Sequence, residues 1–339
     1  MVNRFIVFII IVVAFVVALV WALAAGQFPI SMTEMAYLIF AKMTGADPAG
    51  AHAAANADVV LFEIRGPRIV AAFMVGAALS AAGAAYQNLF RNPLVSPDIL
   101  GVSSGAALGA VLGIFLSLPI IVIQGLAFVG GLAAVALIFF MGRQIRGRDP
   151  ILTLVLTGVV VASLLGSGLA LVKYLADPYN QLPAITYWLL GSFSGVTRQS
   201  AGVAAALFAI SLVPLFLLRW RINLLALPDD EARALGLDVK RTRLIVIVAA
   251  TLMTAVSVAL CGIVGWVGLV VPHAVRLLVG AEFSRLLPLA MVVGGTFMVV
   301  VDTLCRTIAQ IEIPPGVLTA VIGTPIFMVL MAATFKPKN

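Results

Sequence analysis

The chain has 339 residues and a formal net charge of +7, and 63% of its residues are hydrophobic while 10% are charged. The mean hydropathy is +1.16, and a soluble core of this length could not bury that much apolar surface. The composition therefore excludes a soluble protein and predicts a chain that uses lipid as its solvent. Little sequence is left for a separate soluble domain, so residues 1–339 are expected to form a single transmembrane domain.

Apolar tracts follow one another along the chain, separated by glycine, proline and charged residues. A membrane-spanning helix needs about 20 mainly apolar residues, and ten tracts reach or approach this length. They lie near residues 5–25, 66–88, 97–117, 120–141, 150–175, 199–218, 243–262, 264–279, 285–305 and 315–335. The predicted fold is an all-α integral membrane protein with ten transmembrane helices, of which the eighth is short and contains Pro272.

The first tract also has some features of a secretory signal. Arg4 precedes it, and small residues end it at Ala25. The apolar part of a signal is typically 7–15 residues long, whereas this tract runs from Phe5 to Ala25. We therefore expect it to remain as the first transmembrane helix.

Capping and glycine patterns add detail to the third tract. Ser96-Pro97-Asp98 combines a capping side chain with a proline suited to a first helical turn, which predicts that the third helix begins near Pro97. Glycine then recurs at every fourth position, which leaves one face of the helix without side chains. The glycines are Gly101, Gly105, Gly109 and Gly113. We expect this face to pack closely against another helix, and Gly76, Ser80 and Ala84 form a similar stripe on the second helix.

The distribution of basic residues predicts the orientation. With the N-terminus in the cytoplasm, 15 of the 21 lysines and arginines fall on the cytoplasmic side, as the positive-inside rule expects. The six on the outer side are Lys42, Arg65, Arg68, Lys173, Arg198 and Arg306. Both termini are then cytoplasmic.

Ionisable residues are nearly absent from the centres of the predicted helices. An ion-coupled secondary transporter, which is the alternative interpretation, would need such residues there to form an ion path. Asp302 and Arg306 lie one helical turn apart near the outer end of the ninth helix and are expected to pair. His273 is interpreted as a hydrogen-bonded helix residue, and Cys261 and Cys305 as packing residues. No catalytic, cofactor or metal site and no nucleic-acid partner is predicted.

The energy source is then expected on another polypeptide, because no Gly-x-x-x-x-Gly-Lys-Ser/Thr phosphate loop occurs in the sequence. A separate ATPase would need a docking surface in the cytoplasm. The one internal cytoplasmic segment long enough to fold runs from Arg219 to Arg243. The carboxylates of Asp229 to Glu231 favour a helix start there, and Gly236 favours a helix stop. Several leucines in this segment indicate a partner surface rather than a solvated loop.

Three blocks of sequence carry a resemblance to a known family. The first runs from Arg65 to Gly109, the second from Leu224 to Arg243, and the third comprises residues 265–280 and 304–327. They resemble the permease subunits of the cobalamin, iron-siderophore and haem ABC importers, which are type II importers. With matching spacing, the resemblance covers nearly the whole chain from Arg65 onward.

The resemblance implies partners and contact residues. It implies ten helices per subunit, a second permease copy in a homodimer or pseudo-dimer, two ATP-binding subunits, and a substrate-binding protein outside the membrane. Residues of the segment at about 220–242 would couple the permease to the ATPase, namely Leu227, Asp229, Asp230, Glu231, Ala232, Arg233, Leu235 and Gly236. Arg65, Arg68 and Arg306 would dock the binding protein. Pro228 departs from the family, which commonly has glycine there, and predicts a stiffer entry into the coupling helix.

The resulting prediction is the permease of an ABC importer in the cytoplasmic (inner) membrane. It would form the path for a metal-chelate nutrient, with an iron-siderophore expected first and haem or cobalamin next, while a separate subunit hydrolyses ATP. A membrane-embedded enzyme is disfavoured, because the predicted helices contain neither a metal-ligand pair nor a nucleophile–base set.

Overall fold

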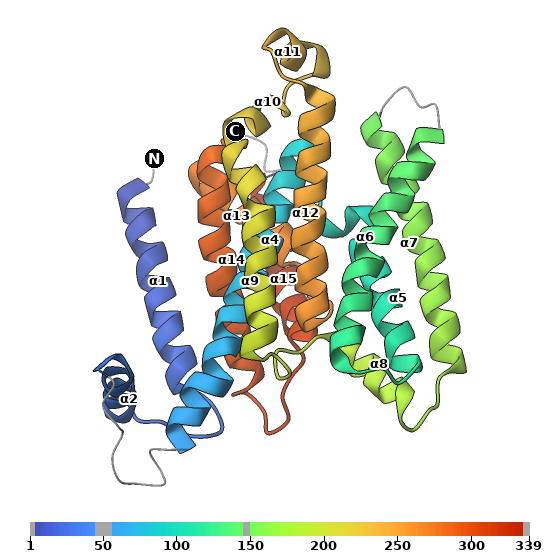
Figure 1. The fold of residues 1–339 in the computed structure, drawn as a ribbon. Helices are drawn as coiled ribbons and strands as arrows, with labels where there is room; N and C mark the ends of the chain where they lie inside the picture. Colours follow the sequence, from blue (N-terminus) through green and yellow to red (C-terminus); the bar gives the residue numbers. More distant parts are fainter. Residues whose placement is uncertain (1–3, 45–55, 145–149, 335–339) are drawn as a thin grey trace.

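The computed structural model describes residues 4–44, 56–144 and 150–334, and these ranges contain helices but no strands (Figure 1). Four basic residues used to predict the orientation, Arg146, Arg148, Lys336 and Lys338, lie outside these ranges. Helices occur at all ten predicted positions, which confirms the predicted fold. They are α1 (Arg4–Ala24), α4 (Gly66–Leu89), α5 (Val102–Phe115), α6 (Ile120–Gln144), α7 (Pro150–Leu175), α9 (Arg198–Leu217), α12 (Val239–Cys261), α13 (Val267–Val279), α14 (Phe283–Cys305) and α15 (Pro315–Thr334).

Seven of the described helices are long and apolar enough to cross a membrane, and the apolar stretches of α1, α5 and α13 are shorter. Six further short elements were not among the predicted spans. They are α2 (Met32–Thr44), the π-helix η1 (Val59–Arg65), the 3₁₀-helix η2 (Pro97–Leu100), α8 (Gln181–Leu190), α10 (Arg219–Leu224) and α11 (Asp229–Ala234). Of these, only the helix at 229–234 was expected, as part of the coupling segment.

Helix α4 forms the axis of the bundle. It contacts α1, α9, α12, α13 and α14. The continuous helix 56–89, which contains α4, has 83% of its most apolar stretch buried, whereas α7 and α15 each have 17% of theirs buried. Small residues allow this close approach. A methyl group added to Gly76 would lie 2.7 Å from the carbonyl carbon of Gly294 in α14, and one added to Gly83 would lie 2.7 Å from that of Gly268 in α13.

Helices α5, α6 and α7 form a second group, which α12 joins to the axis through its contacts with α5 and α6. Three of the four glycines with regular spacing lie in the α5–α6 contact. A methyl group on Gly109 would lie 2.8 Å from the carbonyl carbon of Leu126, one on Gly105 would lie 3.0 Å from that of Gly130, and Gly113 faces the side chains of Ile123 and Leu126.

The third helix begins later than the sequence predicted. Pro97–Leu100 forms a separate 3₁₀ turn, and Gly101 adopts a left-handed conformation with φ of +63° that interrupts the helix. The carboxylate of Asp98 then accepts a hydrogen bond from the backbone N–H of Ser103 at 2.9 Å, so it caps α5. Gly101 is therefore a residue of the turn, and its nearest neighbour is Ala162 in α7 rather than a residue of α6.

The two ends of the bundle differ. Helices α10 and α11 project beyond one end, and the start of α1 and the end of α15 point to that same end (Figure 1). We call it the α11 end. The opposite end carries the start of α4, the loop at 306–314 and helices α2 and α8 (Figure 1). We call it the network end, after the polar network described below.

Replacing Gly109 with leucine should separate α5 from α6, because its side chain would overlap the backbone of Leu126. Overpacking of this kind typically costs about 1–3 kcal/mol. We expect the melting temperature of purified Gly109→Leu protein to fall clearly below that of the wild type. Gly166→Leu in α7 is the matched control, since nothing lies within 4 Å of an added methyl group there. Equal melting temperatures for the two variants would contradict the proposed contact.

Candidate functional site

The segment between α9 and α12 folds into two short helices at the α11 end. Three carboxylates occupy the first turn of α11, where they favour the positive end of the helix dipole. The helix stops at Gly236, which has φ of +83°. The N–H of Leu237 donates to the carbonyl of Ala232 at 3.1 Å and the N–H of Gly236 to that of Arg233 at 2.9 Å. These two bonds form a Schellman motif that ends α11.

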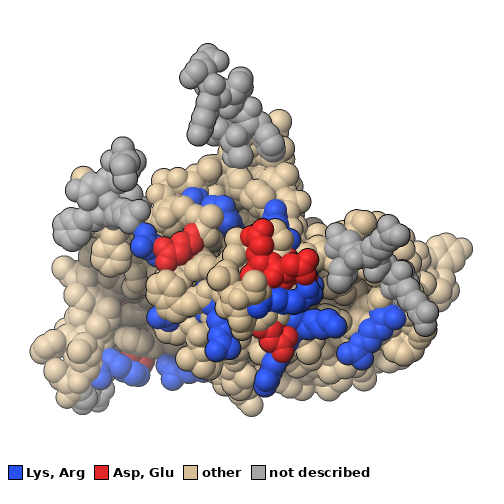
Figure 2. Space-filling model, turned by 90° about the horizontal axis from the view of Figure 1, so that it is seen from above, with Lys and Arg blue, Asp and Glu red and all other residues tan. Residues whose placement is uncertain are grey.

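The predicted coupling residues divide between two faces of α11. Ala232 is 1% exposed and packs inward together with Leu225 and Leu237, which are also buried. The remaining residues lie at least partly on the surface, with Leu227 and Asp229 half-buried and Asp230, Glu231, Arg233, Leu235 and Gly236 exposed. Leu235, an apolar side chain, is 61% exposed. Figure 2 shows this end of the molecule, where basic residues gather around a small acidic cluster.

Asp229 ties α11 to two long helices. Its carboxylate accepts hydrogen bonds from Arg91 at 2.8 Å and from Arg243 at 3.1 and 3.2 Å. Arg91 follows the end of α4 and also donates to the carbonyl of Leu225 at 3.1 Å, and Arg243 lies in α12. Partial burial alone would raise the pKa of Asp229, but the two guanidinium groups hold the pKa below its ordinary value. Asp229 is therefore a charged link between the projecting helix and the bundle.

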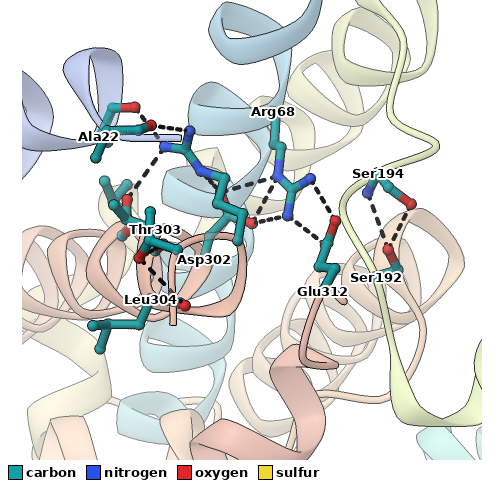
Figure 3. A network of polar contacts seen from close by, with 12 residues as sticks. Ala22, Arg68, Ser192, Ser194, Asp302, Thr303, Leu304 and Glu312 are labelled. Atoms are coloured by element: carbon teal, nitrogen blue, oxygen red, sulfur yellow. Dashed lines mark hydrogen bonds and ion pairs between the residues drawn. The ribbon is translucent and has the colours of Figure 1, made fainter. Parts of the chain in front are cut away.

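At the network end, Arg68 lies between two carboxylates (Figure 3). Its Nε donates to both oxygens of Asp302, at 2.9 and 3.1 Å, and its Nη2 to Asp302 Oδ1 at 2.7 Å. The other edge of the guanidinium donates to Glu312, with Nη2–Oε1 at 2.5 Å and Nη1–Oε2 at 3.1 Å. Arg68 thus joins α4, α14 and the loop before α15.

The other two predicted docking arginines bind the end of α1. Arg65 Nη1 donates to the carbonyls of Leu23 and Ala24 at 2.6 and 3.1 Å, and its Nη2 to that of Phe28 at 2.6 Å. Arg306 donates to the carbonyls of Ala22 and Ala25. The last carbonyls of a helix have no partner within it, so two guanidinium groups supply the missing donors. Arg306 Nε also pairs with Asp302 at 3.5 Å, as its spacing had suggested.

The structure brings Arg65, Arg68 and Arg306 together but buries them. They are 4%, 7% and 9% exposed, so they do not present the free surface charges that direct docking of a binding protein would use. Of the three, Arg306 borders an open cleft of about 440 Å³. The cleft is lined by Gly26, Gln27, Arg306, Thr307, Ile308, Ala309 and Gln310. Docking of a binding protein therefore stays a prediction, and it has to proceed through this cleft or through other residues.

Other candidate residues lie inside the bundle. His273 is 2% exposed and its ring lies 6.4 Å from that of Phe327, while Cys261 and Cys305 are buried free thiols. Within the described ranges, no group of three or more His, Cys, Asp or Glu side chains could hold a metal ion.

The sequence is similar to those of known transport proteins. Residues 11–333 match the FecCD transport family. The molybdate import system permease protein MolB of Haemophilus influenzae is 37% identical over 318 residues, covering 93% of this chain and 92% of that protein. The Fe(3+) dicitrate transport system permease protein FecD of Escherichia coli is 41% identical over 278 residues, covering 80% and 85%.

The fold matches a solved structure as well. A structure described as a metal-chelate type ABC transporter in an inward-facing conformation has a TM-score of 0.86 and 34% identity to this chain. The match covers 98% of this chain and 100% of that one.

Removing Arg68 alone should destabilise the protein more than removing it together with Asp302. Arg68→Leu leaves the Asp302 carboxylate, 1% exposed, without its bidentate partner, and breaking a buried pair typically costs about 3–5 kcal/mol. The Arg68→Leu/Asp302→Leu double variant should recover part of that loss. Arg198→Leu is the control, because Arg198 and its partner Glu63 are 57% and 50% exposed. Exposed ion pairs of this kind contribute about 0–1 kcal/mol to stability.

The measurement is a double-mutant cycle on denaturation of the purified protein. If the effects of the two single substitutions simply added in the double variant, the network would not be coupled as described.

Proposed function

The chain belongs to the FecCD transport family and is a multi-pass membrane permease subunit of an ABC importer, and on that premise we propose that it transports an iron-siderophore complex. The protein is a transport component rather than an enzyme. The name of the Escherichia coli relative, Fe(3+) dicitrate permease, supports an iron chelate as cargo. A second candidate is molybdate, because the relative named for molybdate aligns with 93% of the chain. Haem and cobalamin follow as further chelates.

The proposed role as a permease driven by a separate ATPase rests on one observation, the link between α11 and the interior of the bundle. Asp229 connects α11 through Arg91 to α4 and through Arg243 to α12. These helices have the most buried apolar stretches, 83% and 78%, so a displacement of α11 acts on the axis of the bundle rather than on a peripheral helix. We propose that α11 binds the ATPase and passes its movement to the permease. Asp230, Glu231 and Leu235 are available on its outer face for that contact.

The proposed orientation follows from the same assignment. The α11 end faces the cytoplasm, with both termini on that side, and the network end faces outward. The gathering of basic residues at the α11 end supports this orientation through the positive-inside rule (Figure 2). The complete importer would contain a second permease copy, two ATP-binding subunits and an external binding protein.

The binding protein is proposed to dock at the network end. Arg306 borders the cleft of about 440 Å³ there and is the one of the three predicted arginines that a partner's acidic side chain could approach through it. Arg65 and Arg68 would act indirectly, because their bonds to α1, Asp302 and Glu312 hold the walls of this surface in place.

Transport by the reconstituted importer tests the cargo. The permease with its own ATPase and binding protein should take up ferric siderophore into proteoliposomes when ATP is present on the α11 side. Uptake is measured with radioactive iron, and molybdate, haem and cobalamin are offered in parallel. ATP-dependent uptake of molybdate without uptake of any iron chelate would select the second candidate. Uptake driven by an ion gradient without ATP would contradict the proposed function itself.

The same assay tests the coupling role of Asp229. Asp229→Asn keeps the shape of the side chain but removes the charge that pairs with Arg91 and Arg243, and hydrogen bonds to charged groups are worth about 1.5–3 kcal/mol each. We expect uptake per ATP hydrolysed to fall several-fold. Glu282→Gln is the matched control, because Glu282 precedes α14 at the same end of the bundle and pairs with Arg285 of that helix rather than with α11. Normal coupling in Asp229→Asn would show that α11 acts without this link.

A further inference from the structure

A groove of about 600 Å³ lies between α6, α9 and α12, apart from both ends described above. It is lined by the first turns of α6 and α9 and by the last turns of α12, from Val256 to Leu260. These segments lie in the half of the bundle nearer the network end (Figure 1). The lining stretches of α6, at 120–128, and of α9, at 199–207, each extend about 12 Å along the helix, at 1.5 Å per residue.

Apolar side chains line most of the groove, including Ile120 and Ile121 at its end nearer the network end, and four polar side chains lie among them. Its deeper part is lined by apolar side chains, among them Phe128, Leu207 and Val256. Of the polar side chains, Thr197 and Ser200 lie toward its outer end, where they bond to each other in a capping box. Gln199 lies beside them, whereas Gln124 lies about 6 Å from the start of α6, midway along its lining stretch. Neither side-chain amide has a hydrogen-bond partner among the described residues. Gln124 is half-buried in a spanning helix, where an unpaired amide is costly.

The surroundings of the groove indicate what fills it. Its rim includes Ile121 and Val203, which are 64% and 57% exposed, and the apolar surface continues along α9 to Ile210, which is 64% exposed. In a membrane-spanning bundle, an exposed apolar surface that no protein partner covers is in contact with lipid. A depth of about 12 Å is close to one leaflet of a hydrocarbon core about 30 Å thick. An apolar trough with one amide donor at its rim and one midway along its wall therefore matches one amphiphile, with its chain in the trough and its head at the rim.

We propose that this groove is a binding site for one acyl chain of a phospholipid from the leaflet at the network end. The ester or phosphate oxygens of that lipid accept hydrogen bonds from the amides of Gln124 and Gln199. The bound chain fills the space between α6 and α9, so it supports the contact of the α5–α7 group with the axis of the bundle.

Photolabelling of the permease–ATPase complex tests this site. The complex is reconstituted in vesicles of phosphatidylethanolamine and phosphatidylglycerol, a fraction of which carries a diazirine on the acyl chain. After irradiation, adducts are mapped by mass spectrometry. We expect several-fold more adduct on residues 120–128 and 199–207 than on Val16, Val17 and Val20 of α1, which are exposed, lie in the same half of the bundle and do not line the groove.

A variant that fills the groove distinguishes specific lipid binding in the groove from general contact with lipid. A methyl group added at Gly125, which lines the groove, meets nothing within 4 Å, so the backbone there tolerates a side chain. Gly125→Leu should therefore fill the groove and lower the groove adducts several-fold. Gly202→Leu on α9 is the matched control, because it is equally open but does not line the groove. Groove labelling no greater than that of the α1 residues, or equal labelling in the two variants, would overturn the proposal. Absent groove labelling beside labelled α1 residues would also overturn it and would mean that a protein partner covers the groove.

Discussion

The hydrocarbon core of a membrane cannot donate or accept hydrogen bonds, and the fold of this molecule depends on that constraint. Each backbone group within the membrane must be satisfied by the chain itself, which is why the described residues form helices and no strands. The same constraint acts on charged side chains. The donors of Arg65, Arg68 and Arg306 are directed to carbonyl groups and to the carboxylates of Asp302 and Glu312 rather than to solvent. Where helices approach most closely, glycine replaces the side chains, as at Gly76 and Gly83 of α4.

The two ends use charge in different ways. At the network end, ion pairs of Arg68 join α4, α14 and the loop before α15, and arginine hydrogen bonds to the last carbonyls of α1 hold that helix in place. At the α11 end, the charges are half-exposed, and a single carboxylate, Asp229, holds a short projecting helix to α4 and α12. The network end is therefore rigidly packed, whereas α11 is attached to the bundle through one ion-paired carboxylate. This difference suits a subunit that receives movement from a partner on one side of a membrane. The position of α4 along the axis joins both ends.

The sequence predicted the positions of the spanning helices well, because a helix in lipid needs apolar residues and hydropathy measures them directly. It located ten helices but missed α2 and α8, which are too short to cross a membrane. It also placed the start of the third helix at Pro97, because a left-handed turn at Gly101 has no hydropathy signal. The coupling segment was found because its carboxylates and Gly236 are local helix signals.

The site contacts could not be predicted in the same way. Arg68 and Glu312 are 244 residues apart, and Arg91 and Asp229 are 138 apart, so only the packing of the helices brings them together. Hydropathy places an arginine along the membrane normal but does not say whether it points into the bundle or away from it. For that reason Arg65, Arg68 and Arg306 were expected as surface charges, although the structure buries them.

The account rests on which end of the bundle faces the cytoplasm, and accessibility of single cysteines measures this directly. Asp230 at the α11 end and Gln310 at the network end are both exposed, whereas the native Cys261 and Cys305 are 3% and 0% exposed and give little background. A membrane-impermeant maleimide is added to intact cells and to permeabilised cells carrying either variant. We predict that Gln310→Cys is labelled in intact cells and that Asp230→Cys is labelled only after permeabilisation. The reverse pattern would place α11 outside, away from any cytoplasmic ATPase, and would contradict the account.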